Sequence, residues 1–255
     1  MPDNGLIVVD IEAELDRLAR EYRQAGGMGL QVLNLIGTQA DSLLDRLPKG
    51  VRDNLGEGTE TALKLAMKAA HSSRGVVGDQ PQWLNTMVNT TLGAAGGFGG
   101  LPTALAELPV TTTILLRAIQ GVARDHGFDP GAENVQFDCI EVFAAAGPLE
   151  RDDGADLAFL TTRMALTGAT VQGLIARVAP RLATALGQKL AAQTVPVLGA
   201  MAGAATNYAY TSYYQKIAGV HFGLRKLAID GDTSQEELVL RLKTRLVKPP
   251  KTMAG

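Results

Sequence analysis

The chain has 255 residues and a formal net charge of −2, and 46% of its residues are hydrophobic against 20% charged. This is the composition of a folded globular protein, so intrinsic disorder is excluded, and the lack of a basic excess argues against a nucleic-acid partner. With Cys139 as its one cysteine, the sequence cannot form an intramolecular disulfide.

Helical periodicity extends along nearly the whole sequence, whereas strand signals are scarce. Residues 8–24 predict an amphipathic helix, because four apolar side chains fall on one stripe: Ile11, Leu15, Leu18 and Tyr22. The helices predicted after it cover, in chain order, residues 29–47, 54–73, 83 to the glycine-rich stretch, 103–126, 135–147, 155–178, 180–193, 195–228 and a last helix that begins near 233.

Local signals mark several helix ends. Gly127 is placed as a C-cap and the following "DPGAEN" as a turn. Ser234 and Glu237 have the spacing of a capping box at the start of the last helix.

The expected fold is a single all-α domain over residues 1–255. It is a multi-helix bundle around a central pair of small-residue, apolar helices, with an N-terminal helix within residues 1–27 and a frayed tail at 248–255. The N-terminal sequence lacks the basic start and apolar run of a signal peptide, which predicts a cytoplasmic protein.

Two segments, residues 80–106 and 190–215, contain no Asp, Glu, Lys or Arg. Both carry small-residue spacing that brings helix backbones close together. The glycines expected at such contacts are Gly93, Gly97, Gly100, Gly199 and Gly203. Three alternatives remain for these segments: buried helices of a soluble bundle, a membrane-inserting hairpin, or a phosphate site. The phosphate site is the weakest, because Pro102 occupies the third glycine position of a dinucleotide fingerprint.

Polar residues with a potential chemical role are few. The stretch "RDHGFDPGAENVQFDCIE" gathers acids that could bind a hard cation, but its spacing matches no calcium loop and also suits helix punctuation. No metal or cofactor is therefore predicted. Cys139 lies in an apolar helix and is expected in the core. Glu107 and Arg117 interrupt an otherwise apolar helix, and Asn207 interrupts another, so each needs a partner if it is buried.

Two runs of sequence carry a family resemblance. "LPTALAELPVTTTILLRAIQGVARDHGFDP" with "CIEVFAAAG", and later "VPVLGAMAGAATNYAYTSYYQKIAGVHFGLRKL", are similar to the EcsC protein family of bacteria over about residues 29–227. The resemblance maps onto Glu107, Pro109, Arg117, Gly127, Asp129, Cys139, Glu141, Pro196, Gly199, Gly203, Asn207, Phe222 and Arg225. It implies no reaction. The family name comes from an operon that encodes an ABC transporter, which implies work near a membrane.

The sequence thus leaves three functions open and does not decide whether the protein is an enzyme. The first is a membrane-associated or lipid-interacting accessory protein linked to transport or secretion, bound peripherally at the inner face of the plasma membrane through lipid or a membrane-protein partner. The second is a hydrolase with a buried polar cluster. The third is a soluble homo-oligomeric scaffold. The polar residues taken as functional candidates are Glu107, Arg117, Asp129, Cys139, Glu141, Asn207 and Arg225.

Overall fold

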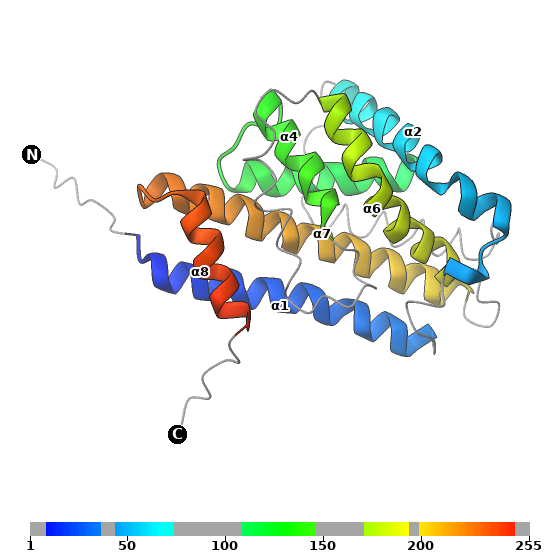
Figure 1. Ribbon diagram of the computed structural model, residues 1–255, viewed down its shortest axis with the longest axis horizontal. Coiled ribbons are helices and arrows are strands. Elements are labelled where there is room, and N and C mark those ends of the chain that lie inside the picture. The colour runs from blue at the N-terminus through cyan, green and yellow to red at the C-terminus, as the bar shows by residue number, and fades with distance from the viewer. Residues whose placement is uncertain (1–8, 37–43, 74–108, 146–170, 194–198, 248–255) are drawn as a thin grey trace, which may run out of the picture.

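The computed structural model describes residues 9–36, 44–73, 109–145, 171–193 and 199–247, and every regular element among them is a helix (Figure 1). The all-α prediction is therefore confirmed for this part of the chain. In order, the elements are α1 (Ile11–Ile36), the 3-10 helix η2 (Leu44–Arg46), α2 (Lys49–Ser73), a helix over residues 109–125, α4 (Glu133–Glu141), the 3-10 helix η3 (Val142–Ala144), α6 (Val171–Gln193), α7 (Gly199–Asp230) and α8 (Gln235–Val247).

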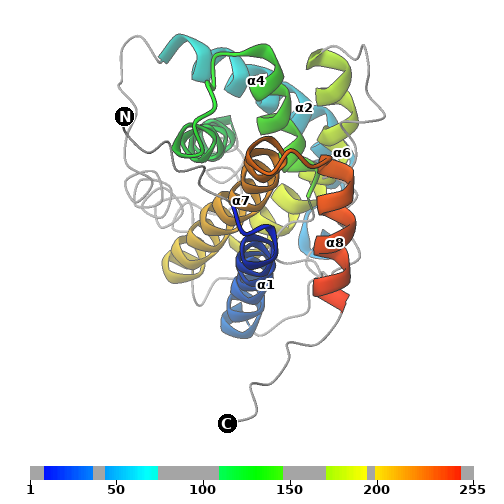
Figure 2. The ribbon, with the colours of Figure 1, turned by 90° about the vertical axis from the view of Figure 1, so that its left-hand side faces the viewer.

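The long helix α7 lies at the centre of the bundle and packs against α1, α6, α8 and η3. α1 runs antiparallel to α7 along the long axis, and the end-on view shows the two helices as neighbours (Figures 1 and 2). α2 pairs with α6 on the opposite side, and α8 contacts both α1 and α7. The buried residues of these helices form one hydrophobic core.

The apolar stripe predicted for the first helix is confirmed. Leu15, Leu18 and Tyr22 are buried, and Ile11 packs at the edge of the core. The predicted break near residues 24–29 is wrong, because α1 continues through the glycines at 26 and 27 to Ile36. A glycine lowers helix propensity by only about 1 kcal/mol relative to alanine, and tertiary packing along α7 outweighs that cost.

The predicted helix boundary at Pro180, between residues 155–178 and 180–193, is also wrong. α6 runs unbroken from Val171 to Gln193 with Pro180 inside it, while residues 155–170 of the predicted helix lie outside the described part. An interior proline costs roughly 3 kcal/mol through its missing N–H and its clash with the preceding turn. Pro180 itself is exposed, and buried Leu182 and Leu186 anchor the helix beyond it.

The predicted turn signals are confirmed. Gly127 has a left-handed φ of 86°. Its N–H donates to the Arg124 carbonyl at 2.8 Å, and the Phe128 N–H donates to the Ala123 carbonyl at 3.0 Å, which is the Schellman pattern. In the turn that follows, Asp129 Oδ1 accepts the Gly131 N–H at 2.8 Å.

The capping box of α8 is half formed. Ser234 Oγ accepts the Glu237 N–H at 3.2 Å, as predicted. The Glu237 carboxylate does not return to the cap, because it pairs with Arg241 at 3.3 Å one turn further along α8.

The glycines predicted at helix contacts stay predictions. Gly93, Gly97 and Gly100 lie outside the described residues, and Gly199 and Gly203 lie in the first turns of α7. One close approach that needs glycine is between α7 and α1. A Cβ added at Gly223 would lie 2.7 Å from Leu18 Cδ2, and one added at Gly219 would lie 2.3 Å from Glu21 Oε1.

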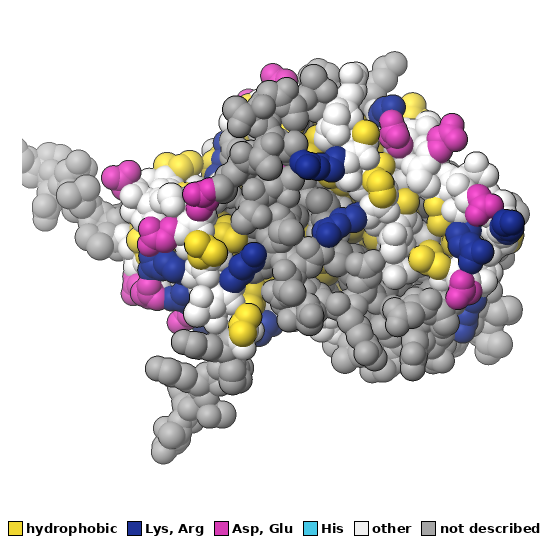
Figure 3. Space-filling view, in the orientation of Figure 1, with side chains coloured by type: hydrophobic (Ala, Val, Ile, Leu, Met, Phe, Trp, Pro, Cys, Tyr) yellow, Lys and Arg dark blue, Asp and Glu magenta, His cyan; other side chains and the backbone are white. Residues whose placement is uncertain are grey.

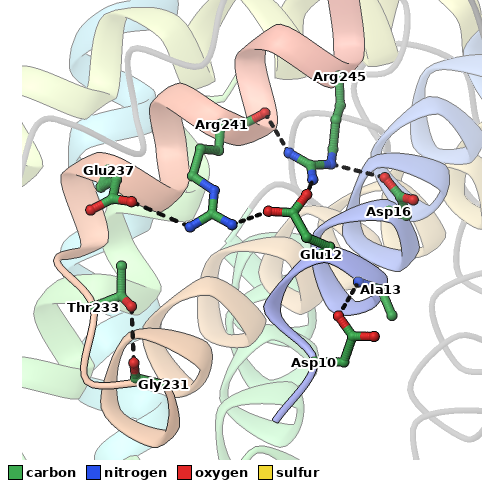
Figure 4. A network of polar contacts seen from close by, with 9 residues as sticks. All are labelled: Asp10, Glu12, Ala13, Asp16, Gly231, Thr233, Glu237, Arg241 and Arg245. Atoms are coloured by element: carbon green, nitrogen blue, oxygen red, sulfur yellow. Dashed lines mark hydrogen bonds and ion pairs between the residues drawn. The ribbon is translucent and has the colours of Figure 1, made fainter.

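The surface mixes both signs of charge. On the face shown in Figure 3, basic and acidic side chains alternate at the two ends of the molecule. A group of ion pairs ties α8 to α1, where Arg241 and Arg245 both bind the Glu12 carboxylate and Arg245 Nε also donates to Asp16 Oδ1 at 2.8 Å (Figure 4). Within the ranges that the structure describes, no helix has the length and apolar character to cross a membrane.

Candidate functional site

Two neighbouring positions on α4 place carboxylates in the core. Asp138 and Glu141 are three residues apart on the helix, so they share one face. Both are buried, with 0% and 1% of their surfaces exposed, between the buried side chains of Val135, Cys139, Ile140 and Val142. Carboxylates are almost never fully buried without a compensating partner, so this face of α4 must meet polar groups.

The facing groups come from the C-terminal half of α7. His221 and Arg225 are four residues apart and therefore also share a helix face. Arg225 forms an ion pair with Asp138 Oδ2, and His221 Nε2 lies 3.7 Å from Asp138 Oδ1. We call these four side chains, Asp138, Glu141, His221 and Arg225, the α4–α7 centre.

Aromatic rings close one side of the centre. The Arg225 guanidinium lies over the Phe128 ring at 4.4 Å from its centroid, a cation–π contact. Phe128 in turn packs against Phe222 with ring centroids 5.6 Å apart. The left-handed turn at Gly127 is what brings Phe128 back over α7. The centre is therefore screened from water by an apolar wall, which strengthens electrostatic interactions inside it.

The histidine of the centre is 1% exposed, and neither of its ring nitrogens forms a hydrogen bond with any residue in the described ranges. Its distance of 3.7 Å to the Asp138 oxygen exceeds hydrogen-bonding range. An imidazole, a guanidinium and two carboxylates that are largely buried together can exchange protons, hold a cation or polarise a bound molecule.

Two of the predicted functional residues, Glu141 and Arg225, belong to the α4–α7 centre. Cys139 is fully buried in the core, as its apolar surroundings predicted. Asp129 is exposed and caps a turn. Glu107 lies outside the described residues, so its predicted role and its relation to Arg117 remain predictions.

Arg117 and Asn207 lie on other parts of the bundle framework. Arg117 is half-buried on the helix over residues 109–125. Asn207 is fully buried on α7, but at about 1.5 Å per residue the helix carries it roughly 21 Å away from His221. A single site that contains both Asn207 and Arg225 is thus ruled out by the rigid helix between them.

The sequence analysis missed Asp138 and His221 as members of one site. Asp138 was only one of several acids in its stretch, and His221 stood alone. A usable signal was present, because Asp138 and Glu141 both fall within the otherwise apolar "VQFDCIEVF" and His221 within "GVHFGL". A charged residue on the apolar face of a core helix indicates a functional site more strongly than a cluster of charged residues along the sequence does.

Comparison with known proteins gives one family. The model of the EcsC protein family matches residues 79–227, which is more than half of the chain and includes α4 and most of α7. No curated protein and no solved structure matches the chain significantly.

Proposed function

The chain belongs to the EcsC protein family, and we propose that it is a hydrolytic enzyme whose reacting groups lie in the α4–α7 centre. The observation that carries this proposal is the pairing of a buried imidazole with a buried carboxylate, His221 Nε2 to Asp138 Oδ1 at 3.7 Å, inside an apolar core. Titratable groups brought together at low dielectric are typical of acid–base catalysis.

Each member of the centre has a chemical role in this proposal. His221 takes a proton from an attacking water, and Asp138 orients its ring. Glu141 is a second carboxylate on the same helix face, available to return a proton to the leaving group. Arg225 binds Oδ2 of Asp138, which fixes the direction of the other carboxylate oxygen, Oδ1, toward His221.

The test is a panel of chromogenic carboxylic esters, phosphate monoesters, phosphate diesters and peptides, offered to the purified full chain. We expect turnover of one class, and a loss of about 100-fold or more in His221→Gln, which is the size of a general-base contribution. His126→Gln is the matched control, because His126 binds the Val122 carbonyl at a helix end and belongs to no part of the centre.

The proposal fails if no class is turned over faster by the wild-type chain than by His221→Gln. It also fails if His126→Gln loses as much activity as His221→Gln. Circular dichroism and urea unfolding of each variant separate a loss of chemistry from a loss of fold.

A second function, membrane association as an accessory protein, is supported by the composition of residues 80–106, a charge-free, glycine-rich segment outside the described residues. Co-sedimentation with vesicles of phosphatidylcholine and phosphatidylglycerol tests it. Binding that Phe98→Asp weakens would support it, and a chain that stays in the supernatant with these vesicles would refute it. The homo-oligomeric scaffold stays a prediction that light scattering in detergent-free buffer decides.

A further inference from the structure

We infer that the α4–α7 centre binds one divalent transition-metal ion, with Asp138, Glu141 and His221 as its protein ligands. The inference rests on the same centre as the proposed function and refines it, because with an ion bound the ion, rather than His221, would activate the attacking water. Binding can be measured without any turnover. Its starting point is that one ligand atom from each of the three side chains lies within 4.8 Å of the other two, and that all three side chains are buried.

The spacing of these atoms suits a shared ion better than direct contact. Ligands held at about 2.0–2.2 Å from a zinc-like ion lie roughly 3.4 Å apart in a tetrahedral site and about 4 Å apart or more when they are opposite each other. The 3.7 Å between His221 Nε2 and Asp138 Oδ1 falls in that interval. Because no two of these ligand atoms are more than 4.8 Å apart, each needs to move by less than about 1 Å to bind one ion.

The histidine supplies an independent reason for a ligand. A buried polar group without a hydrogen bond costs about 1–3 kcal/mol, so an unsatisfied buried imidazole is unfavourable. Both ring nitrogens of His221 are in this state as far as the described residues are concerned. Coordination of a metal by Nε2 removes the penalty at the nitrogen that already faces Asp138.

The charges of the α4–α7 centre favour a cation, and its ligand atoms favour a transition-metal ion. The centre holds two carboxyl groups against the single guanidinium of Arg225, so it attracts positive charge once both carboxyl groups have lost their protons. Arg225 binds Oδ2 of Asp138, so that Oδ1 of the same carboxylate lies on the side of His221. In metal sites, residues that do not bind the metal commonly orient a ligating carboxylate in this way. One imidazole with two carboxylates is a donor set for Zn²⁺, Fe²⁺ or Co²⁺, whereas Ca²⁺ and Mg²⁺ prefer oxygen alone.

The experiment uses the full chain, stripped with a chelator and titrated with Zn²⁺ by calorimetry and with Co²⁺ by visible absorption. We expect one ion per chain, d–d bands from bound Co²⁺, and a higher Tm with metal. His221→Gln and Glu141→Gln, which keep side-chain size, should weaken binding at least tenfold. His126→Gln should bind as the wild type does.

A further variant keeps the test decisive if His221→Gln does not fold. The sequence contains three histidines, so His71→Gln/His126→Gln leaves His221 as the remaining one. Co²⁺ should then shift and broaden the ring signals of that single histidine in the proton NMR spectrum. An unchanged histidine signal, no stoichiometric binding by the wild type, or equal binding by His221→Gln and wild type would each overturn the inference.

The outcomes also separate this inference from the proposed function. Metal bound at the centre without turnover of any substrate class would refute the hydrolase and leave the metal site standing. Turnover that persists unchanged in chelator, with no ion bound, would refute the metal site and leave the hydrolase standing.

Discussion

The ion pair between Asp138 and Arg225 joins α4 to α7. Asp138 is fully buried, and the Arg225 side chain is 12% exposed with the Phe128 ring against its guanidinium. Such a pair contributes little net stability relative to apolar residues, because desolvation offsets the attraction. Removing one partner lowers the free energy of unfolding strongly, because the other charge then stays buried without its partner.

We therefore expect Arg225→Met to lower the free energy of unfolding by about 3 kcal/mol, measured by urea denaturation at neutral pH in the presence of chelator. Lys226→Met is the matched control. Its ammonium pairs with Asp230 at 2.9 Å on the surface, and that loss should cost about 0.5 kcal/mol or less.

The double variant Asp138→Asn/Arg225→Met completes the cycle. It should be less destabilised than the sum of the two single variants, because neither buried charge is then left alone. Equal costs for Arg225→Met and Lys226→Met, or strict additivity in the cycle, would contradict the role given to this pair.

Among the elements, α1 and α7 approach each other most closely where α7 presents glycine. Gly219 and Gly223 are one turn apart, and Glu21 and Leu18 of α1 lie against them. Leu18 is fully buried and has little room to move, whereas the Glu21 carboxylate is partly exposed and can swing away. The two glycines therefore differ in how much a methyl group would disturb the interface.

Gly223→Ala should lower the free energy of unfolding by about 1–3 kcal/mol through overpacking against Leu18, a cost that exceeds the gain in helix propensity. Gly58→Ala in α2 is the control, because a Cβ there meets nothing within 4 Å, and it should stabilise the protein by about 0.5–1 kcal/mol. Thermal or urea unfolding measures both. A stabilising Gly223→Ala would show that the close approach is absent in solution.

The docking of α8 on α1 depends on charge. Glu12 accepts both Arg241 and Arg245, and all of these side chains are partly exposed. We expect Glu12→Gln to cost about 1 kcal/mol in low salt, near the upper end for surface pairs because two arginines converge on it.

That cost should shrink in high salt, since exposed charges are screened. Lys64→Gln, which breaks the simple surface pair of Lys64 with Glu60 at 2.6 Å, provides the comparison and should change stability by less than about 0.5 kcal/mol. The measurement is urea unfolding at two salt concentrations. A salt-independent effect of Glu12→Gln would point to packing rather than charge.

At the scale of the whole molecule, α7 is the element on which the others are assembled. Between residues 209 and 227 most residues of the helix are buried, including Tyr210, Tyr213 and Tyr214. The Tyr210 hydroxyl donates to the Ala185 carbonyl of α6 at 2.6 Å, so this segment also satisfies polar groups across the bundle. By contrast, residues 49–58 of α2 are mostly exposed.

Native-state hydrogen exchange should therefore show the slowest amides in residues 209–227, at the free energy of global unfolding. Amides of residues 49–58 should exchange through local opening at a lower free energy. Peptide-resolved mass spectrometry measures both segments in one experiment. Equal protection of the two segments would mean that the bundle opens only as a whole, and faster exchange in α7 would contradict its central place.

The sequence predictions that the structure confirms depend on interactions between residues close together in the sequence. The stripe of Leu15, Leu18 and Tyr22, the glycine cap at 127 and the serine cap at 234 each depend on residues within about two turns of one another. The same local reasoning failed at the glycines of α1 and at Pro180. Their cost of about 1–3 kcal/mol is real, but distant packing partners outweigh it.

By itself the sequence determined the helical class, the core-facing side of α1, the helix caps and the membership of a family. Only the tertiary structure decided which polar residues meet. Asp138 and Arg225 are 87 positions apart, and no local rule links them. Their contact, and the place of His221 beside them, depends on how the bundle positions α4 relative to α7. The buried charges of the two helices stabilise each other only once both helices have formed and docked.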